Sequence, residues 1–154
     1  MSSDSNDGST DRRSQTRAAV ERMLQQRQEM LVHYERVSGV DPFSANPPSS
    51  ELMERFVQLL MDYIASGHFG LYQRITEGTE RRKHVMDVAE RTYPTIAATM
   101  EKALDFNDAY DSVDKSAPFD ALSERLSELG EIIANRIEVE DELIAAMLTP
   151  RKDT

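Results

Sequence analysis

DYIASGHFGLYQRI, residues Asp62–Ile75, is the densest cluster of mixed chemistry in this chain. It sets an acid, two tyrosines, a histidine, a phenylalanine and two glycines among aliphatic residues, within a helical pattern. A glycine inside a helix costs about 1 kcal/mol relative to alanine, so two of them indicate close packing or a bend. The pattern leaves open whether the helix stops at Gly67 or only bends there.

Apolar residues recur at steps of three and four on both sides of this stretch, which is the helical period. The pattern predicts helices over residues 12–37, 51–66, 68–76, 79–92, 96–111 and 119–148. Pro94 is expected to interrupt the helical hydrogen bonds between the fourth and fifth of these, and the last helix is roughly 45 Å long at 1.5 Å per residue. No strand-like alternation occurs. The predicted fold is all-α, an elongated up-and-down bundle with a four-helix-bundle-like core and extra short helices.

The chain of 154 residues is long enough for one domain with a real core. Residues 1–11 are mostly Ser, Asp, Asn and Gly, which predicts a disordered N-terminal tail. A single helical domain is then predicted over residues 12–149, with a C-terminal tail at 150–154. The Pro-rich segment at 41–50 cannot continue a helix, and Ser49 or Ser50 is a suitable N-cap for the helix that follows.

Composition excludes several classes of function. The chain has no cysteine, which removes disulfide scaffolds, thiolate zinc sites and cysteine nucleophiles. Its net charge of −10 argues against direct DNA binding, which needs clustered basic residues. No apolar run approaches the roughly 20 residues of a membrane span, and the N-terminus lacks the apolar region of a secretory signal. A cytoplasmic protein that does not enter a membrane is the expectation.

The negative charge is concentrated in the last third of the chain. Between Glu101 and Thr149 there are thirteen acidic residues and four basic ones, an excess of nine negative charges. A long acidic helix surface suits a basic partner protein. On charge alone, a solvated helix face with no other role is the preferred interpretation.

The sequence does not predict an active site. A ferritin-like di-iron bundle needs Glu-x-x-His on two helices, but Met30, Ala65 and Arg81 lie three residues before the three histidines. The G-x-S-x-G nucleophile elbow and the phosphate-binding loop are both missing, and no pair of carboxylates stands out as buried. We therefore expect no metal, no cofactor and no catalytic residue. His33, flanked by apolar residues, is expected to be structural.

The central stretch resembles the signature of the Rsd/AlgQ family of bacterial regulators of the primary sigma factor, and it closely resembles the AlgQ-like branch. The resemblance extends over about residues 18–148, through the segments ERMLQQRQEML, YPTIAATMEKALDFNDAYD and ELGEIIANRIEVEDELI. The last segment holds, in order, Arg136, Glu140, Asp141 and Leu143. Met23 departs from the family pattern, in which an aromatic residue is usual.

The resemblance implies an anti-sigma factor and not an enzyme. Members of this family bind region 4 of the primary sigma factor and sequester it from core RNA polymerase as growth slows. Region 4 is a basic helix-turn-helix domain, so an acidic helical surface is chemically suited to it. Relatives are also linked to other regulatory proteins. Two alternatives stay open: a helical adaptor for a metabolic or signalling enzyme, and a metal- or ligand-binding bundle.

The implied contact surface combines the central stretch with the first helix. Asp62 would pair with a cation of the partner, His68 would donate a hydrogen bond, and aromatic side chains would be apolar anchors. The helical spacing of Phe69 and Tyr72 fits a core position equally well. The predicted partner-binding residues are Asp62, Ser66, His68, Phe69 and Tyr72, together with Arg22, Arg27 and Leu31.

Overall fold

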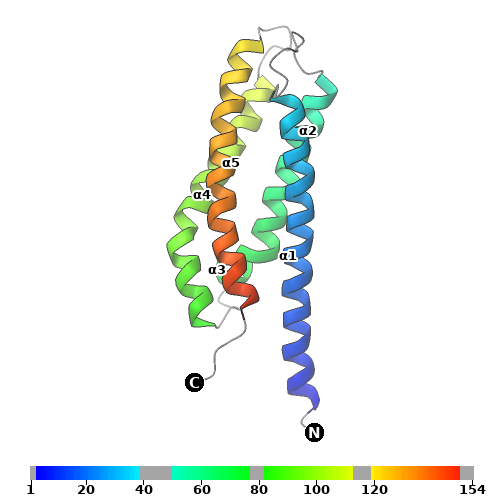
Figure 1. Cartoon of the computed structure of the whole chain (residues 1–154), viewed down its shortest axis with the longest axis vertical. Helices are drawn as coiled ribbons and strands as arrows, with labels where there is room; N and C mark the ends of the chain where they lie inside the picture. Colours follow the sequence, from blue (N-terminus) through cyan, green and yellow to red (C-terminus); the bar gives the residue numbers. More distant parts are fainter. Residues whose placement is uncertain (1–2, 39–49, 77–81, 113–118, 150–154) are drawn as a thin grey trace.

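The protein, in a computed structural model, is an elongated bundle of four long helices (Figure 1). Residues 3–38, 50–76, 82–112 and 119–149 are described, and all the regular elements within them are helical. The elements are α1 (Ser3–Val37), α2 (Ser50–Gly67), η1 (His68–Tyr72), α3 (Gln73–Thr76), α4 (Lys83–Ser112) and α5 (Phe119–Leu148). The predicted all-α, up-and-down architecture is confirmed. The predicted Pro-rich connection at 41–50, apart from Ser50 at the start of α2, and the C-terminal tail lie outside the described residues.

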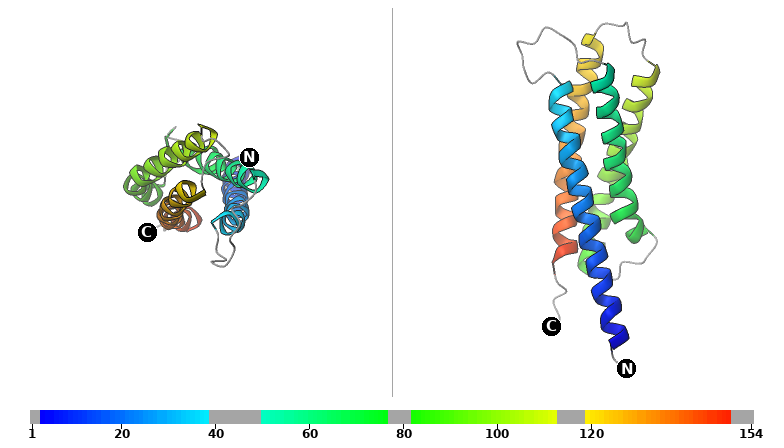
Figure 2. Two further views of the ribbon diagram at one scale, coloured as in Figure 1. Left: turned by 90° about the horizontal axis from the view of Figure 1, so that it is seen from above. Right: turned by 90° about the vertical axis from the view of Figure 1, so that its right-hand side faces the viewer.

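The four long helices form two antiparallel hairpins. α1 packs extensively along α2, and α4 packs extensively along α5, whereas α2 meets α4, and α1 meets α5, more sparsely. Seen along the bundle, the helices follow one another around the axis in the order α1, α2, α4, α5 (Figure 2). The joint between the hairpins is therefore the part of the fold that depends most on a few specific contacts.

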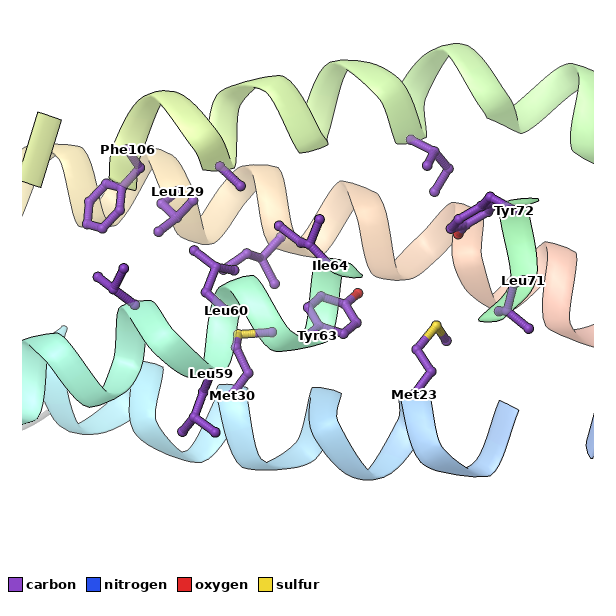
Figure 3. Packing of buried hydrophobic residues seen from close by; sticks show 14 of the residues in the cluster. Met23, Met30, Leu59, Leu60, Tyr63, Ile64, Leu71, Tyr72, Phe106 and Leu129 are labelled. Atoms are coloured by element: carbon purple, nitrogen blue, oxygen red, sulfur yellow. The ribbon is translucent and has the colours of Figure 1, made fainter. Parts of the chain in front are cut away.

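The core lies along the axis of the bundle and is filled by apolar side chains from all four helices. On α5 the buried positions follow steps of three and four residues, from Leu126 through Leu129 and Ile133 to Leu143 and Met147. That spacing keeps one stripe of the helix toward the other three. Figure 3 shows how side chains meet there, with labels on Met23, Met30, Leu60, Tyr63, Phe106 and Leu129.

The first helix begins earlier than the sequence predicts. α1 starts at Ser3, whereas a disordered tail was expected up to residue 11 and a helix only from residue 12. Ser, Asp and Gly residues are poor at nucleating a helix, but here they extend one that is already formed. Extension fixes one residue for each hydrogen bond gained, so it costs much less than nucleation.

The predicted interruption at Pro94 is wrong, because α4 is continuous from Lys83 to Ser112. Proline removes one main-chain donor and normally disrupts the preceding turn. Here Ala89 and Ile96, on either side of it, are both buried in the core. Thr92 Oγ also donates to the carbonyl of Val88 at 2.8 Å. Packing of both halves on the same core outweighs the local cost.

The helical path does not stop at Gly67. It continues through the π-helical turn η1, in which the N–H of Gln73 bonds the carbonyl of His68, five residues earlier. Gly67 has ordinary helical angles, with φ −62° and ψ −46°. A methyl group on it would meet Arg136, Met23 and Tyr72 at 3.5 Å each. These are ordinary van der Waals distances, so close packing does not by itself require a glycine at this position.

Gly130 marks a closer approach between the hairpins. A methyl group at this position of α5 would lie 2.1 Å from Tyr34 Oη and 2.8 Å from Tyr34 Cζ. The tyrosine is fixed there because its hydroxyl donates to the carbonyl of Leu126 at 2.8 Å and its ring packs on Phe56, with 5.8 Å between centroids. The absence of a side chain at Gly130 lets α1 lie against α5.

Gly130→Ala should lower the free energy of unfolding by about 1–3 kcal/mol, the usual cost of overpacking a fitted site. Alanine favours a helix by about 1 kcal/mol over glycine, but the methyl group must displace Tyr34. Urea denaturation measures the change, and Gly67→Ala is the matched control because its methyl group meets neighbours only at 3.5 Å. If the two variants were equally stable, Tyr34 would not be held as described.

Candidate functional site

The centre of the bundle holds a buried ion pair on α5. Arg136 is 2% exposed and Glu140 is 0% exposed. They lie one helical turn apart, and Arg136 Nε donates to Glu140 Oε2 at 3.0 Å. Two charges removed from water need further partners to offset the cost of desolvation.

Arg136 finds its other partners on α4, α2 and η1. Its Nη1 donates to Thr99 Oγ at 3.1 Å and to the carbonyl of Ile96 at 3.3 Å. The guanidinium carbon lies 5.7 Å from the ring centroid of Tyr63 and 5.9 Å from that of Tyr72. At these distances the aromatic faces stabilise the cation.

Glu140 is held by groups from α2 and α1. The hydroxyl of Tyr63 donates to Glu140 Oε1. Arg27 Nη1 lies 3.7 Å from the same oxygen and donates to Asp141 Oδ1 at 2.9 Å. The network therefore takes one or more side chains from each of the four long helices, and it connects the two hairpins. We call Arg27, Tyr63, Thr99, Arg136 and Glu140 the central network.

Burial dominates the electrostatics of the central network. Desolvation raises the pKa of Glu140, while Arg136, the hydrogen bond from Tyr63 and Arg27 all oppose that rise. Burial, and then the charge of Glu140, raise the pKa of Tyr63 well above its ordinary value. The same two causes raise the pKa of Tyr72. Both tyrosines therefore stay neutral at physiological pH and act as donors or aromatic faces.

This buried network was not predicted from the sequence. The charge count treats Glu140 as one of the acids of a helix surface, whereas its side chain is buried. A signal was present: Arg136 and Glu140 continue the three- and four-residue spacing of Leu129, Ile133 and Leu143. Two charged residues at successive core positions of one helix predict a buried pair.

The arrangement is suited to holding the bundle together, not to chemistry on a substrate, because its charged groups are enclosed and paired. Among the residues that the structure describes, no group of three or more His, Asp or Glu side chains could hold a metal ion. Two histidines contact main-chain carbonyls: His33 Nδ1 lies 3.0 Å from Glu29 O, and His84 Nε2 lies 2.9 Å from Ala146 O.

The predicted partner surface is partly accessible on α2 and η1. Asp62, Ser66 and His68 are all intermediate in exposure. Asp62 accepts a hydrogen bond from Gln58, one turn earlier, at 3.2 Å, and that bond leaves carboxylate acceptor capacity for a partner. Phe69 belongs to η1, but its side chain lies outside the described residues.

Tyr72 occupies the core position that its spacing left open as the alternative to a partner anchor. It is 3% exposed, and its ring faces Arg136 (Figure 3 labels the tyrosine). A side chain this buried contributes little area to a partner that docks on the surface. The apolar anchors of an interface therefore have to come from other residues.

The three predicted residues of α1 do not face the same way. Arg27 reaches α5 through Asp141, and Leu31, one turn later, packs beside the core. Arg22 lies about 140° around the helix from Arg27 at 100° per residue, and it is exposed. The eight predicted residues therefore do not form one patch, and Arg27 is engaged within the bundle.

The outer faces of α4 and α5 carry the acidic surface that the charge distribution predicted. Its exposed members are Glu101, Asp105, Asp108, Glu124, Glu128, Glu131, Glu138, Asp141 and Glu142. Few basic residues interrupt it on α5, where Arg125 is exposed. Within the described ranges, none of the helices combines the length and the apolar character that crossing a membrane requires.

The fold and this site define a class of protein: an all-helical bundle of two hairpins, joined by a buried Arg–Glu–Tyr network and acidic on its outer faces. Residues 4–148 match the family described as "Regulator of RNA polymerase sigma(70) subunit, Rsd/AlgQ". The chain belongs to this family, which confirms the resemblance of the central stretch.

Curated relatives agree with this assignment. The chain is 30% identical over 133 residues to the protein named "Regulator of sigma D" of Enterobacter sp. (strain 638), covering 84% of this chain and 79% of the relative. It is 31% identical over 134 residues to the protein of the same name from Yersinia enterocolitica serotype O:8 / biotype 1B, covering 81% and 77%. The corresponding Yersinia pestis protein is 30% identical over 131 residues, with 81% and 76% covered.

Proposed function

We propose that this chain is a cytoplasmic anti-sigma factor, not an enzyme, that binds region 4 of the primary sigma factor and keeps it from core RNA polymerase as growth slows. Membership of the Rsd/AlgQ family over residues 4–148 is the observation that carries the proposal. The exposed acidic residues of α4 and α5 support it, because a basic helix-turn-helix domain would be attracted to them over several ångströms.

The proposed contact surface is the accessible part of the central stretch: Asp62, Ser66 and His68, with Phe69 beside them in sequence and Arg22 from α1. Asp62 is half-buried, so an ion pair with the partner would be partly desolvated there and worth more than a pair at the rim. Tyr72 is not part of this contact surface, because its ring faces Arg136 in the core.

Calorimetric titration of the protein with purified region 4 of its own primary sigma factor, at low and high salt, tests this function. Tight one-to-one binding that weakens as salt rises is expected, because charged surfaces lose attraction when screened. No heat at either salt concentration would contradict the proposal and favour the adaptor for a metabolic or signalling enzyme.

Asp62→Ala should weaken binding of region 4 by at least about tenfold, equivalent to about 1.4 kcal/mol, because it removes a half-buried anion from the interface. Glu124→Ala is the matched control, since it removes an exposed acid on α5. It should change affinity less and act through the association rate. Unchanged affinity in Asp62→Ala, with the fold intact by circular dichroism, would remove Asp62 from the surface.

A further inference from the structure

Three large hydrophobic side chains of the described residues are more than two-fifths exposed: Tyr93 at 44%, Leu104 at 44% and Leu148 at 43%. Two of them, Tyr93 and Leu104, lie on α4. They are eleven residues apart, which is about three helical turns, so they lie on the same face of the helix. A single exposed apolar residue is ordinary, whereas aligned ones indicate a surface with a function.

Ala97 and Met100 lie between these two residues at steps of four and three, and both are only partly buried. Tyr93, Ala97, Met100 and Leu104 therefore form an apolar row about 16 Å long. We call these four residues the α4 stripe. Met100 also packs against the core, and Tyr93 and Leu104 are the members of the stripe that are well exposed to solvent.

The α4 stripe lies on the side of α4 away from α5. The opposite side of α4, with Thr95 and Lys102, lines a shallow pocket together with Ile132 and Asn135 of α5. Since α4 lies between α5 and α2 in the bundle (Figure 2), the stripe is on the α2 side. Packing of α2 on α4 is sparse, and this leaves Tyr93 and Leu104 in solvent.

A row of acids runs beside the stripe along the same helix. Its exposed members are Glu90, Glu101, Asp105 and Asp108. They lie about 40–120° around α4 from the line that joins Tyr93 to Leu104. The surface thus has an apolar row of about three turns and a parallel negative edge of about five turns.

We propose that the α4 stripe and its acidic row bind an amphipathic helix of another protein, one with an apolar face and a Lys- or Arg-rich edge. An apolar row with period three and four is complementary to the apolar face of such a helix. The acidic row would pair with its basic edge and fix its orientation. This surface shares no residue with the proposed contact residues on α2 and η1, although Glu101, Asp105 and Asp108 also belong to the acidic surface that would attract region 4. The inference therefore goes beyond sigma-factor binding.

Charge selects this occupant over two others. A second copy of this chain would bring the acidic rows of two α4 helices together, and like charges in contact are unfavourable. An anionic membrane would be repelled by the same acids, because helices that lie on membranes carry Lys and Arg on their polar face.

The probe is a synthetic peptide of about 18 residues, five helical turns, built from leucine and lysine in the helical period and labelled for fluorescence anisotropy. Its control has the same composition in a scrambled order that gives no apolar face. We expect the amphipathic peptide to bind at least about tenfold more tightly than the scrambled one. The full chain is used throughout.

Tyr93→Ser/Leu104→Ser should weaken binding of the amphipathic peptide by at least about fivefold, the scale of one lost apolar anchor. Leu148→Ser is the matched control: Leu148 has the same exposure but lies at the end of α5, so affinity should be unchanged. Asp105→Asn/Asp108→Asn should weaken binding and reduce its salt dependence, whereas Glu124→Gln/Glu128→Gln should do so less.

The proposal is wrong if the scrambled peptide binds equally well, if the double serine variant retains full affinity, or if Leu148→Ser loses as much. Region 4 of the sigma factor is titrated into the same variants. Unchanged affinity in Tyr93→Ser/Leu104→Ser is expected, and a parallel loss would show that the stripe belongs to the sigma-binding surface and is no second site. If region 4 did not bind the unsubstituted protein, the proposed function would be contradicted. The peptide titrations would still decide whether the α4 stripe binds an amphipathic helix.

Discussion

Arg136→Met should lower the free energy of unfolding by about 3–5 kcal/mol, the scale for breaking a buried ion pair from one side. The substitution keeps an apolar stem of similar length but removes the cation bonded to Glu140 at 3.0 Å. It also removes the donor to Thr99 and the carbonyl of Ile96. Glu140 is 0% exposed, so water cannot solvate its carboxylate when the arginine is removed.

The cost in Arg136→Met should depend on pH. Burial raises the pKa of Glu140 and Arg136 opposes that rise, so removing the arginine raises the folded-state pKa further. An acid whose pKa is higher in the folded state destabilises the fold at any pH at which the unfolded chain is ionised. That cost is absent below the unfolded-state pKa, grows as pH rises from the unfolded-state to the folded-state pKa, and is constant above it. The variant should therefore lose less stability at about pH 5 than at about pH 8.

A second substitution separates lost pairing from lost packing. Arg136→Met/Glu140→Gln removes both charges and keeps an amide oxygen that accepts from Tyr63. It should be more stable than Arg136→Met alone, since replacing both members of a buried pair is often neutral. Urea denaturation measures all the variants, with Arg125→Met as the exposed control on α5, expected within about 0.5 kcal/mol. A double variant no more stable than the single one would contradict the role given to Glu140.

The parts of the fold that sequence predicts are those where one periodic signal is unbroken. α5 runs from Phe119 to Leu148, as predicted, because its apolar spacing recurs on both sides of Arg136 and Glu140 and Pro150 follows it. At Pro94 the tendency of proline to interrupt a helix is opposed by tertiary packing. The helix stays continuous because Ala89 and Ile96, on either side of the proline, are both buried. Local propensity is a weak guide wherever tertiary contacts oppose it.

The site was less predictable, because burial is a property of the environment and not of the residue. The residue types of Arg136 and Glu140 do not show whether the pair lies on the surface or in the core. Their positions in the periodic pattern of buried residues do show it. For Tyr72 the helical spacing fitted a core position as well as a partner contact, and spacing alone could not decide between the two. Its burial, together with that of Leu71 beside it, places it in the core.

The joint between the hairpins also depends on an aromatic cluster, and Phe56 is at its centre. Phe56 is 0% exposed. Its ring centroid lies 5.8 Å from that of Tyr34 on α1 and 6.4 Å from that of Phe106 on α4, the latter edge-on. These separations are typical of aromatic pairs that stabilise beyond their buried area. One side chain of α2 thus connects its own hairpin to the other.

Phe56→Ala should lower the free energy of unfolding by about 3–5 kcal/mol, through lost burial and the cavity left behind. The cavity should collapse poorly, because Tyr34 is tied to the carbonyl of Leu126 and cannot follow the missing ring. Urea denaturation measures the effect against Leu148→Ala, a deletion of similar chemistry at 43% exposure, expected within about 0.5 kcal/mol. A loss below about 1 kcal/mol would mean that the hairpins repack around the cavity. The sparse contact between α2 and α4 would then be easily deformed and not closely packed.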